Sequence, residues 1–172
     1  MTGVQTCALP ISLTEGMQQT ILKYSGKKSA EIVPIWTDNE FLKPVPIEEN
    51  PFIKEHHLEN KFLILYSGNI GTSSGVEMLV NIAAEIISEK IQFVIIGEGI
   101  RKKSIEEKVR ALGLTNCILL PWQETDILPF SLASANLSVV SLSAGTSKNA
   151  IPSKLYNYMS VGSPILGLAD SD

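Results

Sequence analysis

The chain of 172 residues has few cysteines, few histidines and no long apolar run, and each shortage excludes some classes of protein or of functional site. Of its two cysteines, Cys7 lies in an N-terminal stretch of unusual composition, which is set aside below. Cys117 then has no second cysteine to pair with, so a disulfide framework is excluded. Cys117 begins an apolar run, so we expect a buried core thiol rather than a nucleophile. No run approaches the roughly 20 apolar residues of a membrane-spanning helix. The N-terminus lacks the basic residues of a signal peptide, so we expect a cytoplasmic protein.

The chain also has no excess of positive charge and few side chains of the kinds that commonly act in catalysis. A net charge of -4 gives no electrostatic case for nucleic acid, so local groups must hold any phosphate ligand. His56 and His57 are the only histidines, and their polar stretch lacks the spacing of a metal site. No Ser-His-Asp set and no obvious carboxylate nucleophile is present, which argues against acyl transfer and hydrolysis.

The first 60 residues divide into three stretches of different character. Residues 1–12 carry no charge and no periodic pattern and resemble a translated sequencing adapter, so they are set aside. Residues 13–35 contain an amphipathic stretch and an apolar run, as expected for the last helix and strand of a preceding domain. Residues 36–60 are rich in proline and acidic side chains, which predicts a linker.

From residue 61 to residue 172, apolar runs of parallel-sheet type alternate with amphipathic stretches. This pattern predicts an α/β domain with a doubly wound, Rossmann-like parallel sheet, incomplete at its C-terminus. Ligands of such sheets bind beyond the carboxyl ends of the strands. The expected strands are 62–67, 92–96, 117–120, 137–141 and 164–168, and the expected helices are 75–88, 101–112, 129–134 and one from Ser153 to Gly162.

A glycine-rich loop, SGNIGTSSG, follows the first of these strands. Gly68 and Gly71 free its backbone to approach a ligand, although a flexible strand-to-helix turn is the alternative. The loop lacks the Gly-Lys-Ser/Thr ending of an ATP-binding P-loop, and its spacing differs from the dinucleotide fingerprint. A nicotinamide enzyme is therefore disfavoured.

Two later strand ends carry candidate nucleoside contacts. Gly97 and Glu98, in IIGEG, allow a ribose or base to pass closely, or form an ordinary turn. Trp122 and Gln123, in LLPWQETD, offer an aromatic wall and hydrogen bonds to a base, with plain packing of Trp122 as the alternative.

The run IPSKLYNYMSVGSPIL, residues 151–166, predicts a helix that binds an anion. Ser153 is placed to cap its start, and Gly162 with Pro164 ends it. Lys154 lies in the first turn, where a cation opposes the helix dipole unless an anion docks there. The expected anion is a phosphate.

The segments IVPIWTD, YSGNIG, IIGEG and PSKLYNYMSVGSPIL, in this order, resemble the C-terminal, donor-binding domain of glycosyltransferase family 4, which has the two-domain GT-B architecture. The similarity extends from Ile32 to the end and is closest to bacterial enzymes that build O-antigen or colanic acid. It implies retaining, metal-independent transfer from a UDP-sugar to a glycan or lipid-linked acceptor, without a cofactor. Residues 13–35 would then be a remnant of the acceptor domain and 36–60 the interdomain linker. We would expect the fragment alone to be inactive and the longer protein to associate peripherally with the inner face of the plasma membrane.

The resemblance also implies a set of donor contacts. The diphosphate would lie near Gly68, Asn69, Gly71, Ser153 and Lys154, the base near Gly97, Glu98, Trp122 and Gln123, and the ribose near Asn157. Catalytic residues stay unassigned.

The chain departs from the family pattern at two pairs of positions. Asn69 and Ser74 stand where many members carry Arg and Lys, and Asn149 and Asn157 stand where the family pairs two glutamates. Lys154 and backbone N–H groups would then hold most of the diphosphate charge. Two other functions remain open: a non-catalytic nucleotide-binding domain, and a nucleotide-sugar epimerase, which the lack of histidine after residue 61 disfavours.

Overall fold

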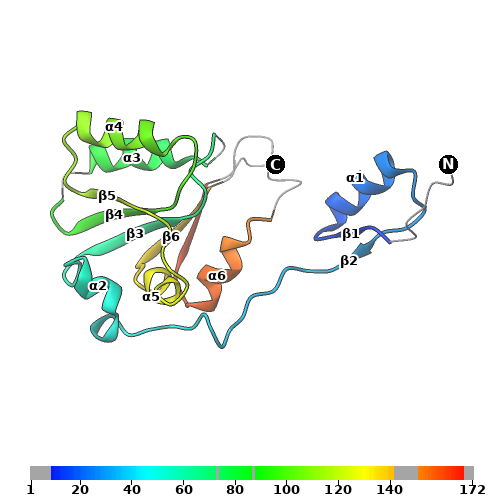
Figure 1. The fold of residues 1–172 in the computed structure, drawn as a ribbon, viewed down its shortest axis with the longest axis horizontal. Coiled ribbons are helices and arrows are strands. Elements are labelled where there is room, and N and C mark those ends of the chain that lie inside the picture. The colour runs from blue at the N-terminus through cyan, green and yellow to red at the C-terminus, as the bar shows by residue number, and fades with distance from the viewer. Residues whose placement is uncertain (1–8, 73, 87, 142–150, 169–172) are drawn as a thin grey trace.

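A computed structural model describes residues 9–72, 74–86, 88–141 and 151–168. Its main feature is a five-stranded parallel sheet of order β5-β4-β3-β6-β7 (Figure 1). The strands are β3 (Phe62–Ser67), β4 (Ile91–Ile96), β5 (Cys117–Leu120), β6 (Leu137–Ser141) and β7 (Ile165–Leu168). This sheet confirms the predicted α/β fold, and each strand begins within one residue of its expected start.

Helices cover both faces of the sheet, as a doubly wound fold requires (Figure 1). One face carries α3 (Val76–Glu85) and α4 (Lys102–Ala111). The other carries α2 (Pro51–Glu55), α5 (Leu128–Ala133) and α6 (Lys154–Ser160).

Alternate residues of β4 supply the two apolar cores. Phe93 and Ile95 belong to the cluster that includes residues of α3 and α4, whereas Val94 and Ile96 belong to the cluster beneath α2, α5 and α6. Because successive side chains of a strand point to opposite faces, a strand buried on both sides reads as an uninterrupted apolar run. Cys117, at the start of β5, is buried as expected, and burial raises the pKa of its thiol to about 12.

Helix α2 lies inside the stretch expected to be a linker. Asn50 caps it by accepting hydrogen bonds from the N–H groups of Phe52 and Ile53, and both of these side chains are buried in the core. A short 3-10 helix (Ile47–Glu49) precedes it, and the buried Leu58 follows it. The linker interpretation of residues 36–60 therefore missed this helix and its packing against the sheet.

The N-terminal elements lie apart from the sheet, at the end of an extended segment (Figure 1). Strand β1 (Ile11–Ser12) pairs in parallel with β2 (Glu31–Ile32), and α1 (Glu15–Ser25) connects them. Ile11 and Ser12, which belong to the stretch of unusual composition at residues 1–12, form this pairing. Among the described residues, no helix is long and apolar enough to cross a membrane.

Candidate functional site

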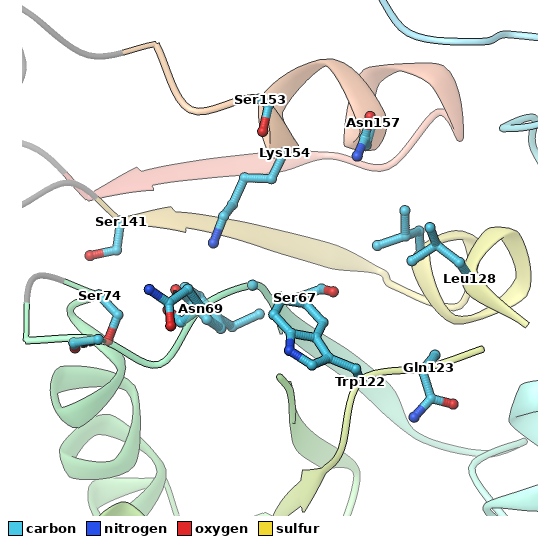
Figure 2. Close-up of a pocket in the computed structure, with 14 residues that line it drawn as sticks. Ser67, Asn69, Ser74, Trp122, Gln123, Leu128, Ser141, Ser153, Lys154 and Asn157 are labelled. Carbon is cyan, nitrogen blue, oxygen red and sulfur yellow. Dashed lines mark hydrogen bonds between the residues drawn. The ribbon is translucent and has the colours of Figure 1, made fainter. Parts of the chain in front are cut away.

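A cavity of about 670 Å³ lies at the carboxyl ends of the strands, between the loop after β3, α6 and the segment after β5 (Figure 2). This is the edge at which doubly wound sheets bind ligands. Eight of the ten predicted site residues line it: Gly68, Asn69, Gly71, Trp122, Gln123, Ser153, Lys154 and Asn157.

Lys154 projects from α6 across the cavity toward the loop after β3 (Figure 2). Its Nζ lies 3.8 Å from the centroid of the Tyr66 ring, a cation–π arrangement. A Cβ at position 68 would collide with this ammonium group as it is placed, so the lysine side chain passes close to the backbone of Gly68.

The charge of Lys154 has no carboxylate partner among the residues that the structure describes, where the ion pairs are Arg101–Glu77, Lys102–Glu98 and Lys108–Glu77. Burial lowers the pKa of Lys154 from 10.5 to about 8 because it removes water from the charged form. A desolvated cation at a cavity wall favours an anionic ligand, because the negative charge of that ligand would offset the lost hydration of the ammonium group.

Tyr66 and Tyr158 hold the loop after β3 and α6 in place. The Tyr66 hydroxyl donates to the carbonyl of Asn69 at 2.8 Å, and burial raises its pKa to about 12. The Tyr158 hydroxyl accepts from the N–H of Ser67 at 2.9 Å, which ties α6 to the end of β3. Burial also raises the pKa of Tyr158, so both phenols stay neutral.

The segment after β5 forms the wall opposite α6. Trp122 is 50% exposed and lines the cavity, so it is not a core residue. The Gln123 side chain donates to the carbonyl of Pro121 at 3.0 Å and keeps its carbonyl oxygen available. Together they offer an apolar face with a hydrogen-bonding group beside it.

The structure does not bring Gly97 and Glu98 into this cavity. A Cβ at Gly97 would collide with the carbonyl of Gly68, so this glycine lets two neighbouring loops pack closely. The Glu98 carboxylate pairs with Lys102, and its backbone carbonyl accepts from Ile70 N–H at 2.7 Å. Both residues contact the loop after β3 and do not line the cavity, which differs from their predicted place beside the base.

For Ser153 we expected both a helix cap and a contact with the diphosphate. Its side chain makes no capping hydrogen bond at the start of α6, but it does line the cavity. Asn149, the other position compared with a family glutamate, lies outside the described residues.

Sequence reasoning did not propose several residues of the wall. Polar groups come from the ends of β3 and β6, and apolar surface comes from α5. These residues are Tyr66, Ser67, Ser141, Leu128 and Leu132. The described residues include no group of three His, Cys, Asp or Glu side chains placed to hold a metal ion.

Comparison with known proteins identifies a matching family and several relatives. Residues 48–171 match the family model described as "Glycosyl transferases group 1". "Putative colanic acid biosynthesis glycosyl transferase WcaI" of Escherichia coli (strain K12) is 36% identical over 104 residues, which cover 60% of this chain and 26% of WcaI. "Probable glycosyltransferase WbjE" of Pseudomonas aeruginosa is 28% identical over 153 residues, which cover 86% of this chain and 37% of WbjE. The chain therefore spans well under half the length of these relatives.

The fold is also similar to that of Anabaena Alr3699/HepE, solved in complex with UDP and glucose. The TM-score is 0.76 at 15% identity, over 91% of this chain and 43% of the Anabaena chain.

Proposed function

This chain belongs to the glycosyl transferases of group 1, and we propose that it binds the nucleotide-sugar donor in the synthesis of a bacterial surface polysaccharide. A UDP-sugar is the donor we favour. The name of WcaI refers to colanic acid biosynthesis, and the Anabaena structure holds UDP.

The observation that carries the proposal is the charge of Lys154. It lies at the cavity wall, its pKa is lowered by burial, and no carboxylate of the described residues neutralises it. A diphosphate placed between Lys154 and the backbone of Gly68 to Gly71 would supply the missing negative charge. Such charge-assisted hydrogen bonds are roughly twice as strong as neutral ones.

The rest of the cavity suits the remainder of a nucleotide. Trp122 offers a face on which a base can stack, and Gln123 lies beside it. Asn157 lies further along α6 than Lys154, toward Leu128, where a ribose would connect diphosphate and base (Figure 2).

The chemistry that we propose is metal-independent transfer with retention of configuration. Lys154 and backbone N–H groups would stabilise the negative charge that develops on the leaving diphosphate. We propose a glycan or lipid-linked acceptor, bound by residues beyond this chain. The reaction would take place in the cytoplasm, with the longer protein at the inner face of the plasma membrane.

Calorimetric titration with UDP and with uridine tests the donor site. We expect Lys154→Ala to weaken UDP binding by about 1.5 to 3 kcal/mol, the value of a hydrogen bond to a charged group, and to leave uridine binding unchanged. Lys103→Ala is the matched control, because Lys103 is exposed on α4 and is not among the residues that line the cavity. The proposal fails if wild-type protein binds no nucleoside diphosphate, and equal losses for both ligands would make Lys154 structural.

A further inference from the structure

One residue of the donor cavity also contacts the extended segment that precedes the sheet. Thr37 Oγ1 donates a hydrogen bond of 3.0 Å to Asn157 Oδ1, across 120 positions of sequence. One turn further along α6, Ser160 Oγ donates to the carbonyl of Leu42 at 3.0 Å. Residues three apart share one side of a helix, so Asn157 and Ser160 form a joint contact with residues 37–42.

This segment is held firmly where it meets α6. Asp38 Oδ1 accepts hydrogen bonds from the backbone N–H groups of Glu40 and Phe41, at 2.9 and 3.1 Å. Leu42 is only 4% exposed and belongs to the core cluster that includes residues of α2 and α5. The hydroxyl of Thr37 is therefore fixed relative to the Asn157 side chain.

The Asn157 amide lies between Thr37 and the cavity. A carboxamide has an acceptor oxygen and a donor nitrogen on opposite sides. In this structure Oδ1 accepts from Thr37 and Nδ2 is on the cavity side, as Figure 2 shows. At this position the cavity thus offers N–H donors, whereas a carboxylate would offer only acceptors.

We propose that Thr37 is a positioning residue, which orients the Asn157 amide so that it donates a hydrogen bond to an oxygen of the bound nucleotide. This inference rests on the proposed function, because the oxygen is that of a ribose hydroxyl between diphosphate and base. Thr37, which lies in the extended segment before the sheet, would then contribute to the recognition of the donor. Ser160 serves as the internal comparison, since it binds the same segment without lining the cavity.

The test is the dissociation constant of UDP, measured by calorimetry for variants whose melting temperatures are recorded in parallel. Thr37→Val removes the hydroxyl but keeps the shape, and we expect about 3- to 10-fold weaker binding, the size of one neutral hydrogen bond. Thr37→Ser restores the hydroxyl and should restore the affinity. Ser160→Ala loosens the segment without freeing the amide and should stay within about twofold of wild type.

Asn157→Leu tests whether the amide is the group that Thr37 positions. It removes the amide, so we expect about 3- to 10-fold weaker binding, and adding Thr37→Val to Asn157→Leu should cause no further loss. Wild-type affinity in Thr37→Val or Asn157→Leu, a further loss in the double variant, or a loss in Ser160→Ala or Thr37→Ser equal to that in Thr37→Val, would overturn the positioning role. If wild-type protein itself does not bind UDP, the proposed function fails first and this inference falls with it.

Discussion

Lys154 shows how one side chain can be unfavourable for the fold and useful for the site. The unfolded chain leaves this lysine solvated, with a pKa of 10.5, whereas burial lowers the pKa to about 8 in the folded protein. The charged form is thus destabilised by folding. Among the described residues, the Tyr66 ring partly compensates this cost through its cation–π contact with Lys154 Nζ.

We therefore expect Lys154→Met to stabilise the protein at pH 7 by about 1 to 3 kcal/mol while weakening UDP binding as Lys154→Ala does. Between about pH 8 and 10.5 the unfolded lysine binds more protons than the folded one, so wild-type stability should rise with pH relative to the variant. Thermal denaturation at pH 7 and pH 10 measures this. The difference in melting temperature should shrink at the higher pH, and Lys103→Met should show neither effect. A destabilised Lys154→Met protein at pH 7 would contradict the argument.

Gly97 and Tyr66 illustrate what sequence could not show about the site. Strand-end glycines and polar residues correctly located most of the cavity wall, because the ends of parallel strands meet at one edge of the sheet. Gly97, however, faces the carbonyl of Gly68, a close approach between loops that no local pattern encodes. Tyr66 reads as a strand residue, and only the tertiary structure places Lys154 over its ring.

Among the elements, the strands were predictable from the sequence because they are buried on both faces, whereas α2 was not predicted because it is short. Strands β3 to β7 appear as apolar runs because each is covered from both sides. Helix α2 has only five residues, so it is too short for a helical period to stand out among prolines and charged side chains. Its signal is Asn50 before Pro51, a capping residue followed by proline at the first helical position.

Asn50 also links two elements on the same face of the sheet. Besides capping α2, its Nδ2 donates to the carbonyl of Phe130 in α5 at 2.8 Å, and the residue is fully buried. We expect Asn50→Ala to lower the free energy of unfolding by about 1 to 3 kcal/mol, since it leaves buried N–H and C=O groups without partners. Urea denaturation measures the change, with the exposed Asn60→Ala as control. Equal stability of both variants would show that the link between α2 and α5 contributes little.

Over the whole molecule, apolar burial is concentrated in the sheet region. Both core clusters consist of residues from Leu42 onward, and α1 has no buried residue. The N-terminal elements are held by the short pairing of β1 with β2 and by a hydrogen bond of 2.6 Å from Gln18 to the carbonyl of Ala30. Such a small set of contacts predicts local opening at low free-energy cost.

Hydrogen–deuterium exchange followed by mass spectrometry can measure this gradient in the full chain. Backbone amides of α1 should exchange at least about tenfold faster than those of β4, because their opening does not disrupt either core. Addition of UDP should then slow exchange in the loop after β3 and in α6, which line the cavity, while leaving α1 unchanged. Lys154→Ala should lose this protection and keep the fast exchange of α1. Protection of α1 equal to that of β4 would mean that the N-terminal elements share the cooperative core, and it would count against assigning them to a separate unit.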